Sequence, residues 1–239
     1  MLFGGTSGWA YPSWKPAFYP DKLPAAKFLP FYASRLNSVE VNYTFRRLAN
    51  EPLFRNWIGE TPPEFRFAVK AHQAITHFRR LRGAEESCSL FLASIEPLRD
   101  AGRLAPVLLR LPPNLRFDGD LLRNFLRTWP SDLRTAMEFR HASWFCEDAY
   151  QLLRAHNVAL CQAETEILDM PRAATADFAY LRYRKDDYSA ADREKLTASV
   201  TSLLHAGDAF VYFKHEDAPN GALWAEELLN RFSGDFERR

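Results

Sequence analysis

Charged side chains stand at the carboxyl ends of several short apolar segments, and their types suit acid–base chemistry. Glu40 lies near the end of SVEVN and Glu138 near the end of RTAMEF. Two carboxyl groups in one site could act as acid and base, because burial and neighbouring cations can separate their pKa values. Lys70, at the end of FRFAVK, could stabilise negative charge or, if desolvated, form a Schiff base. His141 could transfer a proton, the alternative being a loop histidine bonded to backbone.

Four further polar side chains lie at or near the ends of similar segments and could bind a substrate. They are Asn42, Arg110, Arg140 and Arg182. Together with Lys70, the cations outnumber the carboxylates, so a ligand with an anionic group is favoured. The alternative is a buried network of salt bridges that fills the interior of the fold and binds no substrate.

Eight short apolar segments could position these side chains, and helix-like segments separate most of them. The predicted strands cover 2–7, 38–42, 65–70, 105–111, 134–139, 158–162, 177–183 and 208–213. Because Leu, Phe and Ala recur at three- and four-residue spacings, helices are predicted at 24–36, 85–102, 118–129, 146–157, 189–207 and 220–232, with a weaker one at 51–64. Gly102 and Gly207 are expected to end two of these helices.

The alternation of strands and helices predicts parallel strands joined by crossovers. Eight such units predict an α/β fold, a single TIM-like (β/α) barrel of seven or eight mostly parallel strands. We expect residues 1–239 to form this one domain. An open doubly wound sheet is the alternative, but the chain has neither GxGxxG after the first strand nor a GxxxxGKS or GxxxxGKT motif anywhere.

The two faces of a predicted strand differ in polarity. Val39 and Val41 share one face and are expected to meet the helices, whereas Glu40 and Asn42 would point into the barrel. The segment 177–183 is less regular, because Arg182 shares its face with two aromatic residues. Since charges in the middle of a barrel carry a large desolvation cost, we expect the polar set to line the hydrated C-terminal mouth.

Longer motifs make the chain similar to a known family. GTSGWAYPSW at 5–14, FYASRLNSVEVNYTFRRL at 31–48, TPPEFRFAVKAHQAITH at 61–77, LPPNL at 111–115, EFRHASWF at 138–145 and TADFAYLR at 175–182 resemble the YecE-like family (DUF72), a widespread family of unknown function. The resemblance implies a (β/α) barrel, and it implies no particular reaction.

The same resemblance adds positions to the candidate site. Beyond the residues above, the family motifs match Ser7, Trp9, Tyr11, Trp14, Thr44, His77, Ser143 and Trp144. Of these, Ser7, Trp9, Tyr11, His77 and Trp144 are predicted to bind the substrate. The aromatic side chains could instead pack beneath long loops, or could together stack on a sugar or a base.

The overall composition is that of a globular protein with a sizeable core. Hydrophobic residues make up 47% of the chain, and the net charge of +1 gives no electrostatic case for general binding to nucleic acid or to a membrane surface. No apolar run is long enough to cross a bilayer, and no signal peptide is recognisable. Three widely separated cysteines fit a reducing compartment, so we expect a cytoplasmic location.

No cofactor is predicted from the sequence. A divalent metal could be held by Glu40, Glu138, His141, Glu164 and His215. It is not favoured, because no HxxxH or HxH spacing supports it and the nearby cations would repel the ion.

The leading hypothesis is an enzyme that uses acid–base carboxylates and cationic groups on a small anionic substrate, phosphorylated or sugar-like. Its reaction class stays open between hydrolase, lyase and isomerase. One alternative is a nucleic-acid-binding protein or nuclease, in which the aromatic residues take an unstacked base. The other is a non-catalytic ligand-binding protein.

Overall fold

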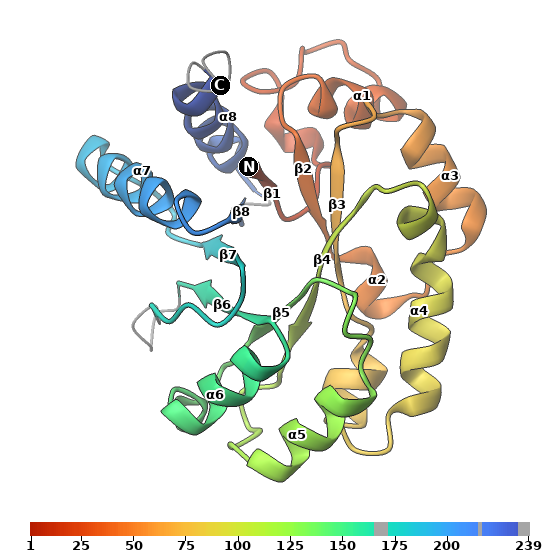
Figure 1. The fold of residues 1–239 in the computed structure, drawn as a ribbon. Coiled ribbons are helices and arrows are strands. Elements are labelled where there is room, and N and C mark those ends of the chain that lie inside the picture. Colours follow the sequence, from red (N-terminus) through yellow and green to blue (C-terminus); the bar gives the residue numbers. More distant parts are fainter. Residues whose placement is uncertain (165–171, 215–216, 234–239) are drawn as a thin grey trace.

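The protein folds as a nearly closed barrel of parallel strands. A computed structural model describes residues 1–164, 172–214 and 217–233, and within them helices separate all consecutive strands except β6 and β7 (Figure 1). They are β1 (Leu2–Thr6), β2 (Ser38–Val41), β3 (Arg66–Lys70), β4 (Leu104–Arg110), β5 (Thr135–Glu138), β6 (Val158–Ala163), β7 (Phe178–Tyr183) and β8 (Asp208–Phe213). The sheet order is β1-β8-β7-β6-β5-β4-β3-β2, and a bridge between Ser7 and Glu40 joins its two ends. The predicted TIM-like barrel is confirmed.

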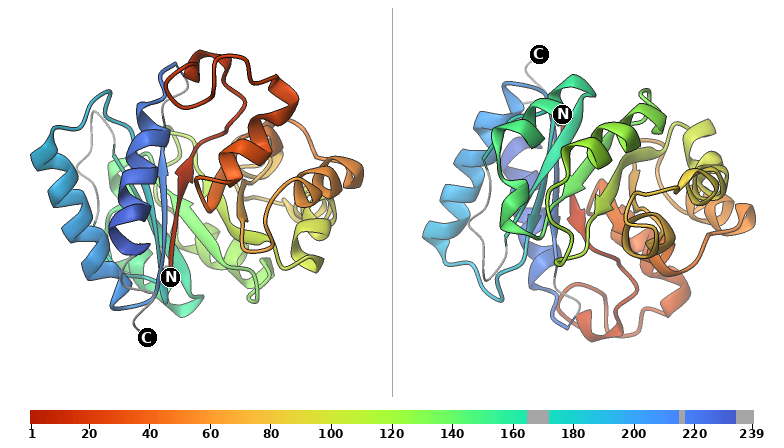
Figure 2. Two further views of the ribbon diagram at one scale, coloured as in Figure 1. Left: turned by 90° about the horizontal axis from the view of Figure 1, so that it is seen from above. Right: turned by 90° about the horizontal axis from the view of Figure 1, so that it is seen from below.

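Helices surround the strands on the outside of the barrel (Figure 2). They are α1 (Phe28–Ala33), α2 (Tyr43–Arg46), α3 (Glu51–Gly59), α4 (Glu85–Asp100), α5 (Gly119–Thr128), α6 (Glu147–Ala155), α7 (Ala190–Leu204) and α8 (Asn220–Ser233). Polar side chains begin several of them: Asn50 and Asp118 accept backbone N–H bonds at the starts of α3 and α5, and Ser189 forms a capping box at α7. Among the described helices, none is long and apolar enough to span a membrane.

Three local predictions need correction. The helix expected over 24–36 is α-helical only at Phe28–Ala33 and is preceded by a 3-10 turn at Ala25–Lys27. Strand β2 stops at Val41, before the predicted 42, because the chain turns at once into α2. Gly102 follows α4 with a φ of +65°, as a helix-ending glycine should. Gly207 instead permits a close approach, since a Cβ there would lie 1.9 Å from the carbonyl oxygen of Asp177.

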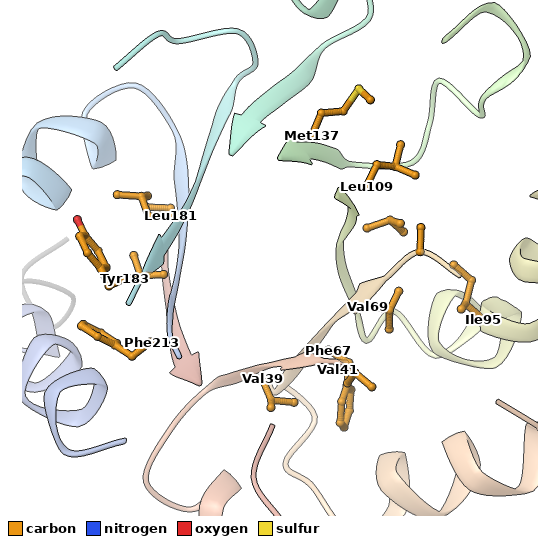
Figure 3. Packing of buried hydrophobic residues seen from close by; sticks show 14 of the residues in the cluster. Val39, Val41, Phe67, Val69, Ile95, Leu109, Met137, Leu181, Tyr183 and Phe213 are labelled. Carbon is orange, nitrogen blue, oxygen red and sulfur yellow. The ribbon is translucent and has the colours of Figure 1, made fainter. Parts of the chain in front are cut away.

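The outward faces of the strands carry the larger apolar core. Val39, Val69, Leu109 and Met137 point away from the barrel axis toward the surrounding helices (Figure 3), and all are fully buried. Their burial between sheet and helices is the main source of stability for this architecture. The face predicted from the alternation of Val39 and Val41 with polar residues is therefore correct.

The inside of the barrel is filled in layers. Its apolar members are Phe3, Ala68, Ala105, Leu108, Ala136, Ala159, Cys161, Ala163, Phe178, Tyr180, Phe210 and Tyr212. Large aromatic rings on β1, β7 and β8 face mainly alanines on β3 to β6, which lets the rings fill the narrow interior. Along β7, Phe178 packs on Phe210 with ring centroids 5.9 Å apart, and Tyr180 packs on Tyr212 at 5.2 Å. Arg182 comes next on the same face, so the ionic layer lies above the aromatic layers.

Side chains supply most of the hydrogen bonds between β1 and β2. The Gly4 N–H donates to the side-chain oxygen of Asn37 at 2.8 Å, and the Asn37 amide donates to the carbonyl of Leu2 at 2.9 Å. The buried hydroxyl of Tyr32 donates to the carbonyl of Ser38 at 3.0 Å. These bonds satisfy backbone groups that a regular ladder would otherwise pair.

Gly5 lies where these two strands approach most closely, and we predict that Gly5→Ala destabilises the fold. A Cβ at this position would stand 1.9 Å from the carbonyl oxygen of Ser38 and 2.7 Å from the Tyr32 hydroxyl. Because a backbone atom must move to admit it, we expect the free energy of unfolding to fall by at least about 2 kcal/mol in urea denaturation.

Gly59→Ala is the matched control, since a Cβ there would meet nothing within 4 Å. It lies at the end of α3 and should leave stability unchanged or raise it slightly. An equal free energy of unfolding for the two variants would show that β1 and β2 can move apart here at little energetic cost, contrary to the prediction.

Candidate functional site

A buried arginine holds two glutamates together across the barrel. Arg182 on β7 donates from Nη2 to Oε1 of Glu40 on β2 at 2.8 Å, and from Nη1 to Oε2 of Glu138 on β5. The exposed fractions of the Arg182 and glutamate side chains are 2% and 0%. Three strands distant in sequence thus meet in one ionic group, at the level where the polar side chains of 38–42, 134–139 and 177–183 were predicted to converge.

Glu40 accepts further hydrogen bonds from two neutral hydroxyl groups. The Ser7 hydroxyl donates to Oε1 at 2.7 Å, and the Tyr180 hydroxyl donates to Oε2 at 2.7 Å. Tyr180 therefore connects the aromatic layer below with the ionic layer above. With the bond from Arg182, both oxygens of this buried carboxylate are satisfied.

Glu138 is surrounded by arginines. Besides Arg182, it accepts from Nη2 of Arg184 at 2.9 Å and forms an ion pair with Nε of Arg110 at 3.0 Å. Arg110 reaches it from the neighbouring strand, because Arg110 and Glu138 are register partners in β4 and β5. The Glu138 carboxylate is thus paired with the guanidinium groups of Arg182, Arg184 and Arg110.

These contacts set the protonation states of both carboxyl groups. Burial alone would raise their pKa values, but the Arg182 charge and the hydrogen bonds outweigh it. The pKa of Glu40 is lowered, and that of Glu138 falls to about 2, where Arg184 and Arg110 contribute as well. Both groups are carboxylates at neutral pH, so a proton donor at this site must be a different group.

The ionic group is buried rather than hydrated, contrary to the expectation that these side chains line a hydrated mouth. The cost of removing these charges from water is offset by direct ion pairing and by hydrogen bonds to the carboxylate oxygens. The charged groups therefore do not need hydrating water around them. Arg110 and Arg184, with side-chain exposures of 20% and 18%, lie nearer to solvent than the Arg182 group.

Lys70 lies beside this group and contacts an aromatic ring. Its Nζ is 3.9 Å from the ring centroid of Phe45, and the residue is buried. The Thr44 hydroxyl donates to the Lys70 carbonyl at 2.7 Å, which ties α2 to the end of β3. Burial first, and then the charges of Arg110 and Arg182, lower the pKa of Lys70 to about 8.

His77 completes the same side of the site. Its ring packs edge-on against Phe45 with centroids 4.9 Å apart, and its Nδ1 lies 2.9 Å from the Thr76 hydroxyl. Burial lowers the pKa of His77, and the charges of Lys70 and Arg110 lower it further, as does Arg140. The imidazole is therefore neutral at physiological pH and can accept a proton.

Two other predicted binding residues lie at the rim. Arg140, two positions beyond β5, is half-buried and forms no ion pair with the residues that the structure describes. Asn42 precedes α2 without capping it through its side chain. Both residues follow the carboxyl ends of their strands, Asn42 after β2 and Arg140 after β5.

His141 caps a turn instead of reaching toward the ionic group. The Ser143 N–H donates to its Nδ1 at 3.2 Å, and the Ser143 hydroxyl lies 2.9 Å from the same nitrogen. Because the Ser143 oxygen accepts from the Phe117 N–H, its own proton is directed to Nδ1. Nδ1 of His141 is therefore bonded to a backbone N–H, which was the alternative to a role in proton transfer.

The aromatic candidates are engaged in packing. Trp144 is fully buried, stacks on Phe139 at 4.5 Å and donates from Nε1 to the Leu115 carbonyl at 2.7 Å. Trp9 is half-buried and packs edge-on against Trp57, and the Tyr11 hydroxyl donates to the carbonyl of Ser7 at 2.8 Å. These contacts favour the packing alternative over a stacking platform for a base or sugar.

The sequence prediction did not single out three members of the site. Tyr180 was counted only as one of the two aromatic residues on the Arg182 face, and Arg184 was not among the candidates. Phe45 was not a candidate either, and it lies in the helical turn of α2. Its one available signal was proximity to Asn42 at the predicted end of β2.

No cluster of metal ligands occurs among residues 1–164, 172–214 and 217–233. Glu40 and Glu138 are occupied by arginines, and Glu164 accepts from the Arg184 N–H at 2.9 Å and from the Tyr188 hydroxyl. His215, the remaining predicted ligand, lies outside the described residues. The oxygens needed for a metal are thus committed to other partners.

A cavity of about 260 Å³ lies away from this site, between the N-terminal ends of α4 and α5. Arg82, Glu85 and Asp118 are among its lining residues, and Arg82 pairs with Asp118 at 2.8 Å. This ion pair is largely exposed, as expected of a surface contact in water. Neither of its residues adds a catalytic group to the site described above.

Fold and site together define a (β/α) barrel protein with a charged group at the carboxyl ends of its strands. The family model "Protein of unknown function DUF72" matches residues 3–238. The chain therefore belongs to the DUF72 family, as its motifs indicated.

Relatives and solved structures agree with this assignment. The chain is 29% identical to the UPF0759 protein YunF of Bacillus subtilis over 157 residues, which cover 63% of this chain and 55% of that protein. It is 28% identical to the UPF0759 protein YecE of Escherichia coli over 148 residues, 62% of this chain and 51% of that one. The matched region thus spans about half the length of these relatives.

Crystal structures of two DUF72 proteins have the same fold. The protein from Thermotoga maritima superposes with a TM-score of 0.87 at 26% identity, covering 97% of this chain and 99% of its own. The protein from Enterococcus faecalis superposes with a TM-score of 0.78 at 19% identity, covering 96% and 98%.

Removal of the central arginine should be strongly destabilising. Arg182→Met would leave Glu40 and Glu138 close together and buried without their shared cation. We expect a loss of about 3 to 5 kcal/mol in the free energy of unfolding, measured by urea denaturation at neutral pH. The control is Arg231→Met, whose ion pairs with Glu194 and Glu227 are exposed to solvent, and whose loss should change the free energy of unfolding far less than that of Arg182.

The stability of the protein should depend on the Glu138 titration. Its folded pKa of about 2 lies below the ordinary value of 4.5, so its contribution is complete above about pH 4.5 and is lost as the pH falls toward 2. We expect this carboxylate to account for roughly 3 kcal/mol of that loss. Urea unfolding at several pH values in this window measures it, and Glu138→Gln should flatten the profile. An unchanged slope in Glu138→Gln would contradict this role.

Proposed function

We propose that this protein is an enzyme that binds a small substrate bearing a phosphate or carboxylate group at the carboxyl ends of β3, β4 and β5. In (β/α) barrels this end carries the substrate site, since loops from successive strands converge there. The observation that carries the proposal is a surplus of cations. Lys70, Arg110 and Arg140 stand together, while Glu138 is shared by three arginines.

The charges do not balance within the described part of the site. Glu40 and Glu138 are matched by Arg182 and Arg184, and the remaining cations repel one another. The repulsion is visible in the lowered pKa of Lys70, to which Arg110 contributes after burial. A bound anion would relieve this repulsion, and arginine offers paired donors that suit phosphate and carboxylate.

We assign the acid–base role to Lys70 and His77. Burial and neighbouring cations lower the pKa of Lys70 to about 8, so it can give up a proton near neutral pH, and the same effects lower the pKa of His77, which is left neutral and able to accept one. Glu40 and Glu138 act as positioning residues that hold Arg182 in place. His141, whose Nδ1 is occupied by Ser143, retains Nε2 for contact with a substrate.

The packing of the aromatic residues favours a small molecule over a nucleic acid. Trp144 is fully buried against Phe139 and cannot stack on a base, and Trp9 is held edge-on against Trp57. The near-neutral charge of the whole chain points the same way.

Binding of inorganic phosphate and of glucose 6-phosphate, with glucose for comparison, tests the proposal by isothermal titration calorimetry. We expect the phosphorylated compounds to bind more tightly than glucose and to weaken with added salt. Arg110→Gln should reduce their affinity about 10-fold or more, since a charge-assisted hydrogen bond contributes roughly 1.5 to 3 kcal/mol.

Arg99→Gln provides the control, because Arg99 pairs with Glu96 and Asp132 on the surface of the barrel. It should leave phosphate affinity unchanged. Glucose binding as tightly as glucose 6-phosphate would contradict an anion site. If a bound compound is recovered unchanged after long incubation, the site binds a ligand without catalysis.

A further inference from the structure

Lys70 differs from the neighbouring arginines in its partners. Arg182 pairs with both Glu40 and Glu138, and Arg184 and Arg110 each pair with Glu138, whereas the Lys70 amine forms no hydrogen bond or ion pair with any residue in the described ranges. Only 7% of Lys70 is exposed. Its nearest defined contact is the face of the Phe45 ring at 3.9 Å.

Such surroundings favour a neutral amine. An ammonium group has three donors and is costly to bury without acceptors, and the nearby guanidinium charges add repulsion. Burial with the Arg110 and Arg182 charges lowers the pKa of Lys70 to about 8, so about half of the molecules carry a free amine at pH 8. A free amine has a lone pair that can attack an electrophilic carbon.

A purely electrostatic role for Lys70 explains this arrangement less well. The site already contains several arginines, which hold carboxylates and phosphates with more donors and never lose their charge. A lysine placed among them adds what they lack, a nucleophilic nitrogen. Its carbonyl is fixed by Thr44 and its amine rests on Phe45, so the side chain is held at the end of β3.

We propose that Lys70 forms an imine with the carbonyl carbon of a small aldehyde or ketone that also bears a phosphate or carboxylate group. This inference rests on the proposed function, because Arg110 and Arg140 would hold the anionic group. The neutral Nζ attacks the carbonyl carbon, a C–N bond forms as the C–O π bond opens, and the carbonyl oxygen takes a proton from solvent. Loss of that oxygen as water then yields the protonated imine.

His77 is placed to carry the protons of these steps. It shares the Phe45 ring with Lys70, and Lys70 is the largest charge effect on its lowered pKa. A neutral imidazole can take a proton from Nζ after attack and return it to the departing oxygen. The positive charge of the imine would lie over the Phe45 face, where a cation–π contact stabilises it.

An imine narrows the class of reaction. Its nitrogen withdraws electrons from the bond next to the former carbonyl carbon, which favours cleavage or proton removal there. Among the classes left open by the sequence, lyase and isomerase chemistry fit this intermediate, and simple hydrolysis does not need it.

The test is reductive trapping of the intact protein. Dihydroxyacetone phosphate or pyruvate is added at pH 8 with sodium cyanoborohydride, and the modified lysine is identified by mass spectrometry of peptides. We expect Lys70 to be modified on the order of 100-fold faster than an exposed lysine, from the difference in free amine. Neutral dihydroxyacetone should label it more slowly, and excess inorganic phosphate should protect it.

Lys70→Arg should abolish the specific adduct, while Lys214→Arg, at an exposed lysine beyond β8, should leave it intact. Peptide mapping of the labelled wild-type protein identifies the modified lysine directly, so the result stands even if Lys70→Arg folds poorly. Adducts distributed over surface lysines, with none enriched at Lys70, would overturn the imine. If phosphate still binds by calorimetry in that case, the anion site survives and only the imine is lost.

Discussion

The structure depends on one buried arginine between two glutamates. Arg182 spans the interior from β7 to β2 and β5, and so links parts of the sheet that have no backbone hydrogen bonds to one another. Each partner alone would be an uncompensated buried charge, but together the carboxylate oxygens are paired and both terminal nitrogens of Arg182 donate to them. The arrangement holds β2, β5 and β7 together across the barrel. It also determines which of the remaining polar side chains are left to bind a ligand.

The position of the site follows from how the interior is filled below it. The rings of Phe178, Phe210, Tyr180 and Tyr212 occupy the lower layers against small residues on the opposite strands. Ionic groups there would have no room and no partners. The Tyr180 hydroxyl marks the boundary, because its ring belongs to the apolar layer and its oxygen bonds to Glu40.

Strand alternation predicted the fold and the faces of β2, since a period of two residues is a local property. It also brought Glu40, Glu138 and Arg182 to one end of the barrel. Their burial could not be predicted, because it depends on pairing between residues 44 and 142 positions apart. Phe45 was missed for a related reason. It reaches the site from the helical turn of α2, which the Thr44 bond to the Lys70 carbonyl ties to the end of β3.

The pairing of β1 has a consequence for synthesis on the ribosome. Its backbone ladder is with β8, from Leu2 opposite Ala209 to Thr6 opposite Phe213, whereas β2 meets it through side chains and one bridge. Strand β1, the first of the barrel to be translated, therefore forms its backbone ladder only after β8, the last strand, has been translated. Until then its edge stays open to other nascent chains, and the side-chain bonds from Asn37 and Tyr32 are its means of early protection.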